Sequence, residues 1–138
     1  MNKLLSVKLI LNNFKTNSSN VFVRNNSNLV KVIDDEKFQL RRIVMSNVKQ
    51  RNSLGVEMIQ SLESAIKTTD YEKTRVLVIS SSCPIVFSAG HNLKELTTEK
   101  GSEFHRKIFK QFSNLCIDLK KLPIPTIAEV QGKNLYYY

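Results

Sequence analysis

The sequence predicts an α/β fold with a partly parallel sheet, and two observations carry that prediction. The apolar, β-branched run at 76–79 is typical of a buried parallel strand. An amphipathic helical pattern at 54–65 separates it from an earlier β-branched run at 38–45. Strand, helix and strand in this order form a crossover, and strands joined by a crossover lie parallel.

The first elements read as a hairpin. Residues 29–33 and 38–45 are rich enough in β-branched and apolar side chains for two strands, and the polar residues 34–37 predict the turn between them. A basic loop follows at 49–52, before the helix.

Ser53 is the predicted N-cap of the first helix. The helix places one apolar face toward the core and ends at 68–70; the face is made by Leu54, Met58, Leu62 and Ala65. Gly55 weakens its first turn. We expect the buried strand that follows to cover 75–80.

A second helix is predicted over 102–121. Apolar residues recur there every three or four positions and form its buried face: Ile108, Phe112, Leu115 and Leu119. Pro123 and Pro125 end it, because neither proline fits a helix interior. Residues 126–130 then predict a third buried strand, which ends at Gln131 and Gly132.

Charge is unevenly distributed along the chain, whose 138 residues give a net charge of +9. Residues 1–33 carry five basic side chains and no acidic one. The basicity is therefore largely a property of the N-terminus, which argues against a nucleic-acid-binding face on the folded part. No apolar run approaches the roughly 20 residues that span a bilayer. Cys83 and Cys116 form no disulfide framework and no CxxC metal pair, which favours a reducing compartment.

The basic, Ser- and Asn-rich segment 1–27 resembles a mitochondrial transit peptide. Arg24 is the sole arginine in this segment, so a disordered polar tail stays open as the alternative.

The segment 87–96, Phe-Ser-Ala-Gly-His-Asn-Leu-Lys-Glu-Leu, is the motif that points most directly to chemistry. Small residues in a turn soon after a buried strand let a ligand approach the backbone. Free N–H groups in such a turn suit a thioester carbonyl or a phosphate.

Together with this segment, the blocks 49–54 and 122–132 give the chain its resemblance to a known family. In order and spacing, the three blocks resemble the first half of the crotonase (enoyl-CoA hydratase/isomerase) fold, and the version at 90–96 resembles that of a mitochondrial member. The resemblance implies the N-terminal part of the crotonase ββα spiral fold over 28–132. We expect a truncated form, with a divergent tail at 133–138.

The resemblance also implies an acyl-CoA thioester as ligand, with CoA as part of the substrate and no separate cofactor. The backbone N–H of His91 falls where the family places one oxyanion-hole donor. The implied CoA-binding residues are Lys49, Gln50, Ala89, Gly90, Asn92, Leu93 and Lys94. Asn92 replaces the more usual aspartate. Members form homo-oligomers, which we do not expect of this truncated chain.

No catalytic side chain is assigned from the sequence. Glu95, Glu103 and Glu129 are interpreted as solvated carboxylates, and the side chains of His91 and His105 as incidental, with no metal site. The second oxyanion donor and the glutamates of the family lie beyond Gly132 in its pattern. Two functions stay open: an acyl-CoA enzyme of fatty acid metabolism, inactive in this form, or a non-catalytic CoA-binding or interaction fragment. Acyl chain length and the choice between hydratase and isomerase chemistry are not predicted.

Overall fold

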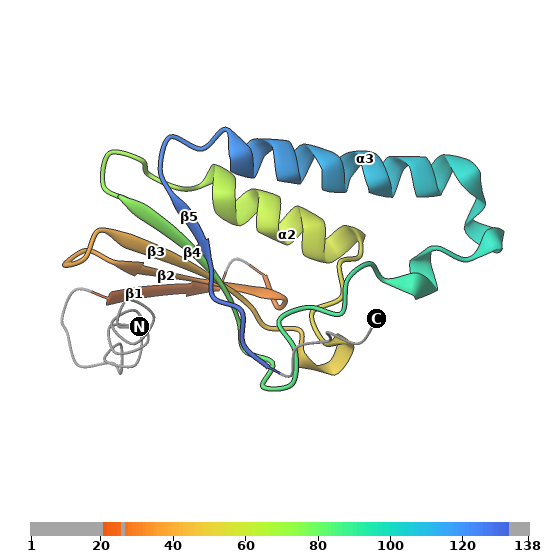
Figure 1. Cartoon of the computed structure of the whole chain (residues 1–138), viewed down its shortest axis with the longest axis horizontal. Coiled ribbons are helices and arrows are strands. Elements are labelled where there is room, and N and C mark those ends of the chain that lie inside the picture. The colour runs from red at the N-terminus through yellow and green to blue at the C-terminus, as the bar shows by residue number, and fades with distance from the viewer. Residues whose placement is uncertain (1–20, 26, 133–138) are drawn as a thin grey trace, which may run out of the picture.

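Antiparallel and parallel pairings combine in one sheet (Figure 1). The computed structural model describes residues 21–25 and 27–132, and their strands are ordered β1-β2-β3-β4-β5. The strands are β1 (Val21–Asn25), β2 (Val30–Asp35), β3 (Leu40–Met45), β4 (Val76–Ser81) and β5 (Thr126–Ala128). β1, β2 and β3 pair antiparallel, whereas β4 runs parallel to β3 and β5 parallel to β4. The predicted α/β fold with a partly parallel sheet is confirmed.

The hairpin of β2 and β3 closes through the polar turn at 36–39. The Asp35 carboxylate accepts a hydrogen bond from the Phe38 N–H at 3.2 Å, and Gln39 adopts a φ of 50°. β2 therefore begins one residue and ends two residues later than predicted, and β3 begins two residues later but ends at Met45 as predicted. β1 was not predicted, and it lies within the segment 1–27 assigned to targeting. Phe22 and Val23 are 50% and 60% exposed, so no clear alternation marks this strand.

Helices cover one face of the sheet in two successive layers (Figure 1). α2 (Val56–Lys67) packs on the strands, and α3 (Gly101–Lys120) packs on α2. The core between them contains Met58, Leu62 and Ala65 of α2 with Ile108 and Leu115 of α3. The two predicted helices are thus confirmed, and their apolar faces with them except for Leu54, while Phe112 and Leu119 are partly buried at the margin.

The N-cap prediction is wrong, because α2 begins two residues later and is capped by Gly55. Ser53 donates its N–H to the Gln50 carbonyl at 3.0 Å and stays in the loop. Leu54 is also outside the helix, where it forms a β-bridge with His91. A long-range contact therefore delays the start of the helix.

Arg41 fixes the opposite end of α2 to the sheet. Its guanidinium is buried and binds both oxygens of Asp34, at 2.6 and 2.8 Å. The same group donates to the carbonyl of Ala65 in the last turn of α2, at 3.4 Å. A cation is stabilised at a helix C-terminus, where carbonyl groups lack intrahelical partners.

β5 corrects the prediction of a buried third strand. All of its residues are exposed, because β4 is its only neighbouring strand in the described ranges. Glu129, just after β5, forms an ion pair with Arg42 of β3 across β4. The Gln131 side chain donates to the Ser81 carbonyl at 2.6 Å, so the segment after β5 continues along β4.

Candidate functional site: a cationic groove at the ends of β3 and β4

The carboxyl ends of parallel β3 and β4 meet at one edge of the sheet, and the loops that follow them enclose a groove. The first loop contains the 3-10 helix η1 (Val48–Gln50), and the second contains η2 (Leu93–Glu95) and η3 (Thr98–Lys100). The groove has a volume of about 500 Å³. Its lining residues are Lys49, Gln50, Arg51, Ser53, Ala89, His91, Asn92, Leu93 and Lys94.

Backbone hydrogen bonds join the two loops directly. The Ala89 N–H donates to the Arg51 carbonyl at 2.9 Å. The Leu54 N–H donates to the Gly90 carbonyl at 2.7 Å, and the Asn92 N–H returns a bond to the Leu54 carbonyl at 3.2 Å. Gly90 has a φ of 80°, a conformation that favours glycine. The groove is therefore held open by main-chain contacts.

The backbone N–H of His91 lies between these bonds and is free of hydrogen-bond partners among the described residues. His91 faces Leu54 in a parallel bridge, so its own N–H and carbonyl lie on the side opposite to Leu54. No described residue accepts a hydrogen bond from this N–H. Such a donor can bind a carbonyl or phosphate oxygen.

The imidazole of His91 packs on α3. Its ring lies edge-on to Phe109 and Phe112, with centroids 5.1 and 4.8 Å apart. Its Nδ1 is buried without a hydrogen-bond partner among the described residues. The His91 side chain thus packs the turn against α3, while the His91 backbone N–H points away from Leu54.

Asn52 is the residue on which the junction of the loops depends. It is fully buried, and its amide donates to the Ser81 hydroxyl at 2.7 Å and to the Phe87 carbonyl at 3.1 Å. Its own carbonyl accepts from the Ser88 hydroxyl at 2.7 Å. Asn52 therefore ties the basic loop to the end of β4 and to the turn after it.

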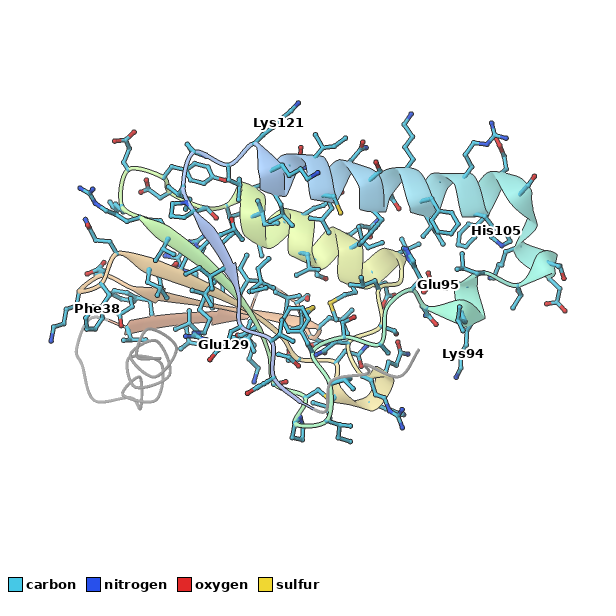
Figure 2. The ribbon with its side chains drawn as sticks, viewed as in Figure 1. Phe38, Lys94, Glu95, His105, Lys121 and Glu129 are labelled. Carbon is cyan, nitrogen blue, oxygen red and sulfur yellow. The ribbon has the colours of Figure 1, made fainter. Side chains whose placement is uncertain are left out.

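Positive charge gathers on both walls of the groove. Lys49 and Arg51 extend from the first loop and Lys94 from the second, and none of the described lining residues carries a carboxylate. In Figure 2, Lys94 projects outward from η2. These cations and the free N–H suit an anionic ligand with an acceptor oxygen.

The structure brings the sequence-predicted residues together. Lys49, Gln50, Ala89, Asn92, Leu93 and Lys94 all line the groove with His91. Gly90 contributes through its carbonyl, which closes the bridge to Leu54. The sequence reasoning gave no role to Asn52 and did not assign Arg51 or Ser53 to the site. A buried asparagine after a basic loop offers no local signal, since its partners lie about 30 residues further along.

Two carboxylates interpreted as solvated are in fact bonded and half-buried. Glu95 accepts hydrogen bonds from the Val56 N–H and from the Asn92 side chain, and Glu129 pairs with Arg42. Glu103 is exposed on α3, as expected. In the described ranges, no cluster of His, Cys, Asp and Glu is arranged to hold a metal, and no helix is both long and apolar enough to cross a membrane.

A family model described as Enoyl-CoA hydratase/isomerase matches residues 35–135. The chain belongs to the enoyl-CoA hydratase/isomerase family. The resemblance carried by the three sequence blocks is thereby confirmed.

Relatives within this family include the mitochondrial enoyl-CoA hydratase domain-containing protein 3 of several vertebrates. The Xenopus laevis protein is 46% identical over 94 residues, which are 67% of this chain and 32% of that protein. The Homo sapiens protein is 43% identical over 94 residues, 67% of this chain and 31% of that protein. The chain thus spans about a third of the length of these relatives.

Solved structures of the enoyl-CoA hydratase/isomerase family share the fold described above. A crystal structure of human enoyl Coenzyme A hydratase domain-containing protein 3 matches with a TM-score of 0.66 and 36% identity. The match covers 82% of this chain and 40% of that one. An enoyl-CoA hydratase of Mycobacterium smegmatis matches with a TM-score of 0.69 and 29% identity, over 74% of this chain and 39% of that one.

Replacing Asn52 by alanine should lower the free energy of unfolding by about 1–3 kcal/mol. The change leaves the partly buried Phe87 carbonyl without this donor and places alanine at a φ of 52°, which asparagine tolerates better. Urea unfolding of the full chain measures the loss. Asn114→Ala, an exposed change on α3, is the matched control and should alter stability by less than about 0.5 kcal/mol. Equal unfolding midpoints for the two variants would contradict the anchoring role.

Proposed function

We propose that the groove binds the CoA moiety of an acyl-CoA thioester. The observation that carries this proposal is the placement of Lys49, Arg51 and Lys94 on two walls of a groove that His91 also lines. CoA presents phosphate groups at one end and a thioester carbonyl at the other. Exposed cations attract the phosphates, and a fixed N–H is suited to the carbonyl oxygen.

Lys49 and Lys94 place positive charge on the groove walls, and Ala89 and Gly90 let a ligand approach the backbone. Ala89 and Gly90 present little side-chain bulk, so the pantetheine arm can run along the main chain beside them. Gln50, Asn92 and Leu93 line the same groove and supply polar and apolar contacts. This assignment rests on the family's pattern and on the positions that these residues occupy.

The His91 N–H would act as one oxyanion donor. A donor fixed at the position where negative charge develops on a thioester oxygen stabilises enolate character at the carbonyl. Hydration or isomerisation also needs positioned acid and base groups, and the groove lining holds no carboxylate. We therefore propose that the 138-residue chain binds acyl-CoA without turning it over.

From the family's chemistry we propose a role among acyl-CoA enzymes of fatty acid metabolism. Because the chain covers about a third of its relatives, that activity is proposed for the longer protein that they represent. A non-catalytic CoA-binding or interaction role is the second candidate, favoured by the absence of a carboxylate from the described groove lining.

Mitochondrial localisation is proposed from the acid-free basic segment at the N-terminus. The relatives' names, which describe mitochondrial proteins, support it. Because β1 begins at Val21 and pairs with β2, processing that retains the sheet would occur before Val21. The boundary at residue 27 would otherwise remove a strand.

CoA should bind the purified full chain, and replacing Lys49 or Lys94 by alanine should weaken that binding. Lys49→Ala and Lys94→Ala each remove an exposed charge, so we expect a loss of about 2–5-fold in affinity by calorimetric titration. The loss should shrink as salt rises, because ions screen exposed charges. Lys107→Ala, an exposed change on α3 outside the groove, is the control and should leave affinity unchanged. Equal affinity of all three variants would sink the assignment of the groove.

Turnover of a short-chain enoyl-CoA by the same preparation should be undetectable. Loss of general acid and base groups alone costs about 10²–10⁴ in rate. Spectrophotometric loss of the enoyl thioester measures it, with a complete enoyl-CoA hydratase as positive control. Turnover that Glu103→Gln or Glu129→Gln abolishes would show that the chain holds a catalytic carboxylate, contrary to the proposal.

Residues 1–27 fused to a fluorescent protein should direct it to mitochondria. We expect this targeting because the segment carries basic side chains and no acidic ones. A matched fusion in which Lys3, Lys8 and Lys15 are replaced by glutamate should stay in the cytosol. Cytosolic fluorescence from the unmodified segment would refute the proposal.

A further inference from the structure

Glu95 joins the second wall of the groove to the N-terminus of α2. One carboxylate oxygen, Oε2, accepts the Val56 N–H at 3.0 Å, and the other, Oε1, accepts a hydrogen from the Asn92 side-chain amide at 3.0 Å. Gly55, the N-cap, has no side chain that could serve this purpose. The helix therefore receives its cap from a residue 39 positions away, and Figure 2 shows Glu95 beside this end of α2.

Glycine at position 55 leaves room for this carboxylate in its observed place. A Cβ at Gly55 would lie 2.3 Å from the Oε1 atom of Glu95, well inside contact distance. Gly55 is buried and its φ is −95°, which any residue adopts, so the requirement is for space. The sequence thus contains a matched pair, a glycine at the helix end and a glutamate that replaces the missing cap.

Asn92 uses both ends of its amide in this arrangement. Its Oδ1 accepts the Lys94 N–H at 3.3 Å, and its Nδ2 donates to Glu95. A carboxylate at position 92 could accept from Lys94 but would place its second oxygen about 3 Å from the Glu95 carboxylate. Like charges at that separation disfavour each other's ionised form. An amide satisfies both neighbours, which gives a physical reason for asparagine where the family usually has aspartate.

We propose that Glu95 is a positioning residue for the groove, and that the Asn92 side-chain amide is the hydrogen-bond donor that holds its carboxylate in place. The carboxylate locks the segment 92–94, and with it Lys94, against α2. The consequence for CoA rests on the proposed function, whereas the lock itself does not. Breaking the lock should release Lys94 and the adjoining backbone from their fixed places on the groove wall.

Asn92 lines the groove and also a second cavity beside the N-terminus of α2, and charged groups surround it on both sides. On the side of α2 and on the side of the groove these are Glu57, Glu95, Lys49, Arg51, His91 and Lys94. Glu57 lies in the first turn of α2 and makes no hydrogen bond to Asn92, so it serves as a control.

Four variants of the full chain test the lock: Asn92→Asp, Glu95→Gln, the double change Asn92→Asp with Glu95→Gln, and Glu57→Gln. The double change exchanges the amide and the carboxylate between positions 92 and 95. The double change therefore keeps one amide donor and one carboxylate in the pair. Asn92→Asp alone instead places two carboxylates next to each other.

NMR titration of the new carboxyl group at position 92 gives a readout that needs no CoA. In Asn92→Asp its pKa should lie above the ordinary aspartate range, because it faces the Glu95 carboxylate, and in the double change it should fall back. The backbone amide signals of Leu93 and Lys94 should shift in Asn92→Asp and return in the double change. An unshifted pKa together with unmoved amide signals would overturn the lock.

CoA affinity, always compared with the unmodified chain at the same pH, gives the second readout. Asn92→Asp should lose about 5-fold or more in CoA affinity at pH 8, and this loss should shrink as the pH is lowered and one of the two facing carboxyls takes up a proton. The double change should recover most of that loss, and Glu57→Gln should leave affinity unchanged. Equal loss in the single and the double change would overturn the positioning role. If the unmodified chain does not bind CoA, the proposed function fails, and the NMR readout alone then decides the lock.

Discussion

The groove depends on a short parallel bridge between the loops that follow β3 and β4. Leu54 bonds to both sides of His91 there, through the Gly90 carbonyl and the Asn92 N–H. The bridge is possible because a crossover through α2 makes the two strands parallel, so that their following loops leave the sheet at one edge. Without that pairing, the basic loop and the small-residue turn would be separate surface segments.

Holding the loops together has a conformational cost that the fold meets locally. Arg51 and Asn52 both adopt left-handed backbone with φ near 51° and 52°, which costs about 1–2 kcal/mol per ordinary residue. Asparagine tolerates it best, and the buried Asn52 amide adds bonds to Ser81 and Phe87. In addition, α2 is fixed at both ends by charge: Glu95 binds its N-terminal N–H and Arg41 its C-terminal carbonyl. Each charge has the sign that the helix dipole favours at its end.

Local patterns account for what the sequence predicts correctly. β-branched runs and apolar periodicity identify β2, β3, β4 and both helices. The crossover rule then gives the parallel pairing of β3 with β4. The failures have another origin: they rest on contacts between distant residues. The start of α2 moves from Ser53 because Glu95 and His91 act on the loop from about 40 residues away. β5 is apolar enough for a buried strand, yet no other described strand lies beyond it. The candidate site residues were found through motif resemblance, whereas Asn52 and Glu95 became visible only in three dimensions.

His91 shows how one residue can contribute to the site and to the packing with separate groups. The bridge turns its backbone N–H away from Leu54, and its ring lies between Phe109 and Phe112 of α3. Any residue except proline supplies a backbone N–H, so the chemistry of the groove sets no demand for an imidazole there. The imidazole instead takes part in packing, through edge-on contacts with Phe109 and Phe112 of α3. Residue 91 thus contributes its ring to packing on α3 and its backbone to the bridge, so a histidine in a functional motif need not act as an acid or a base.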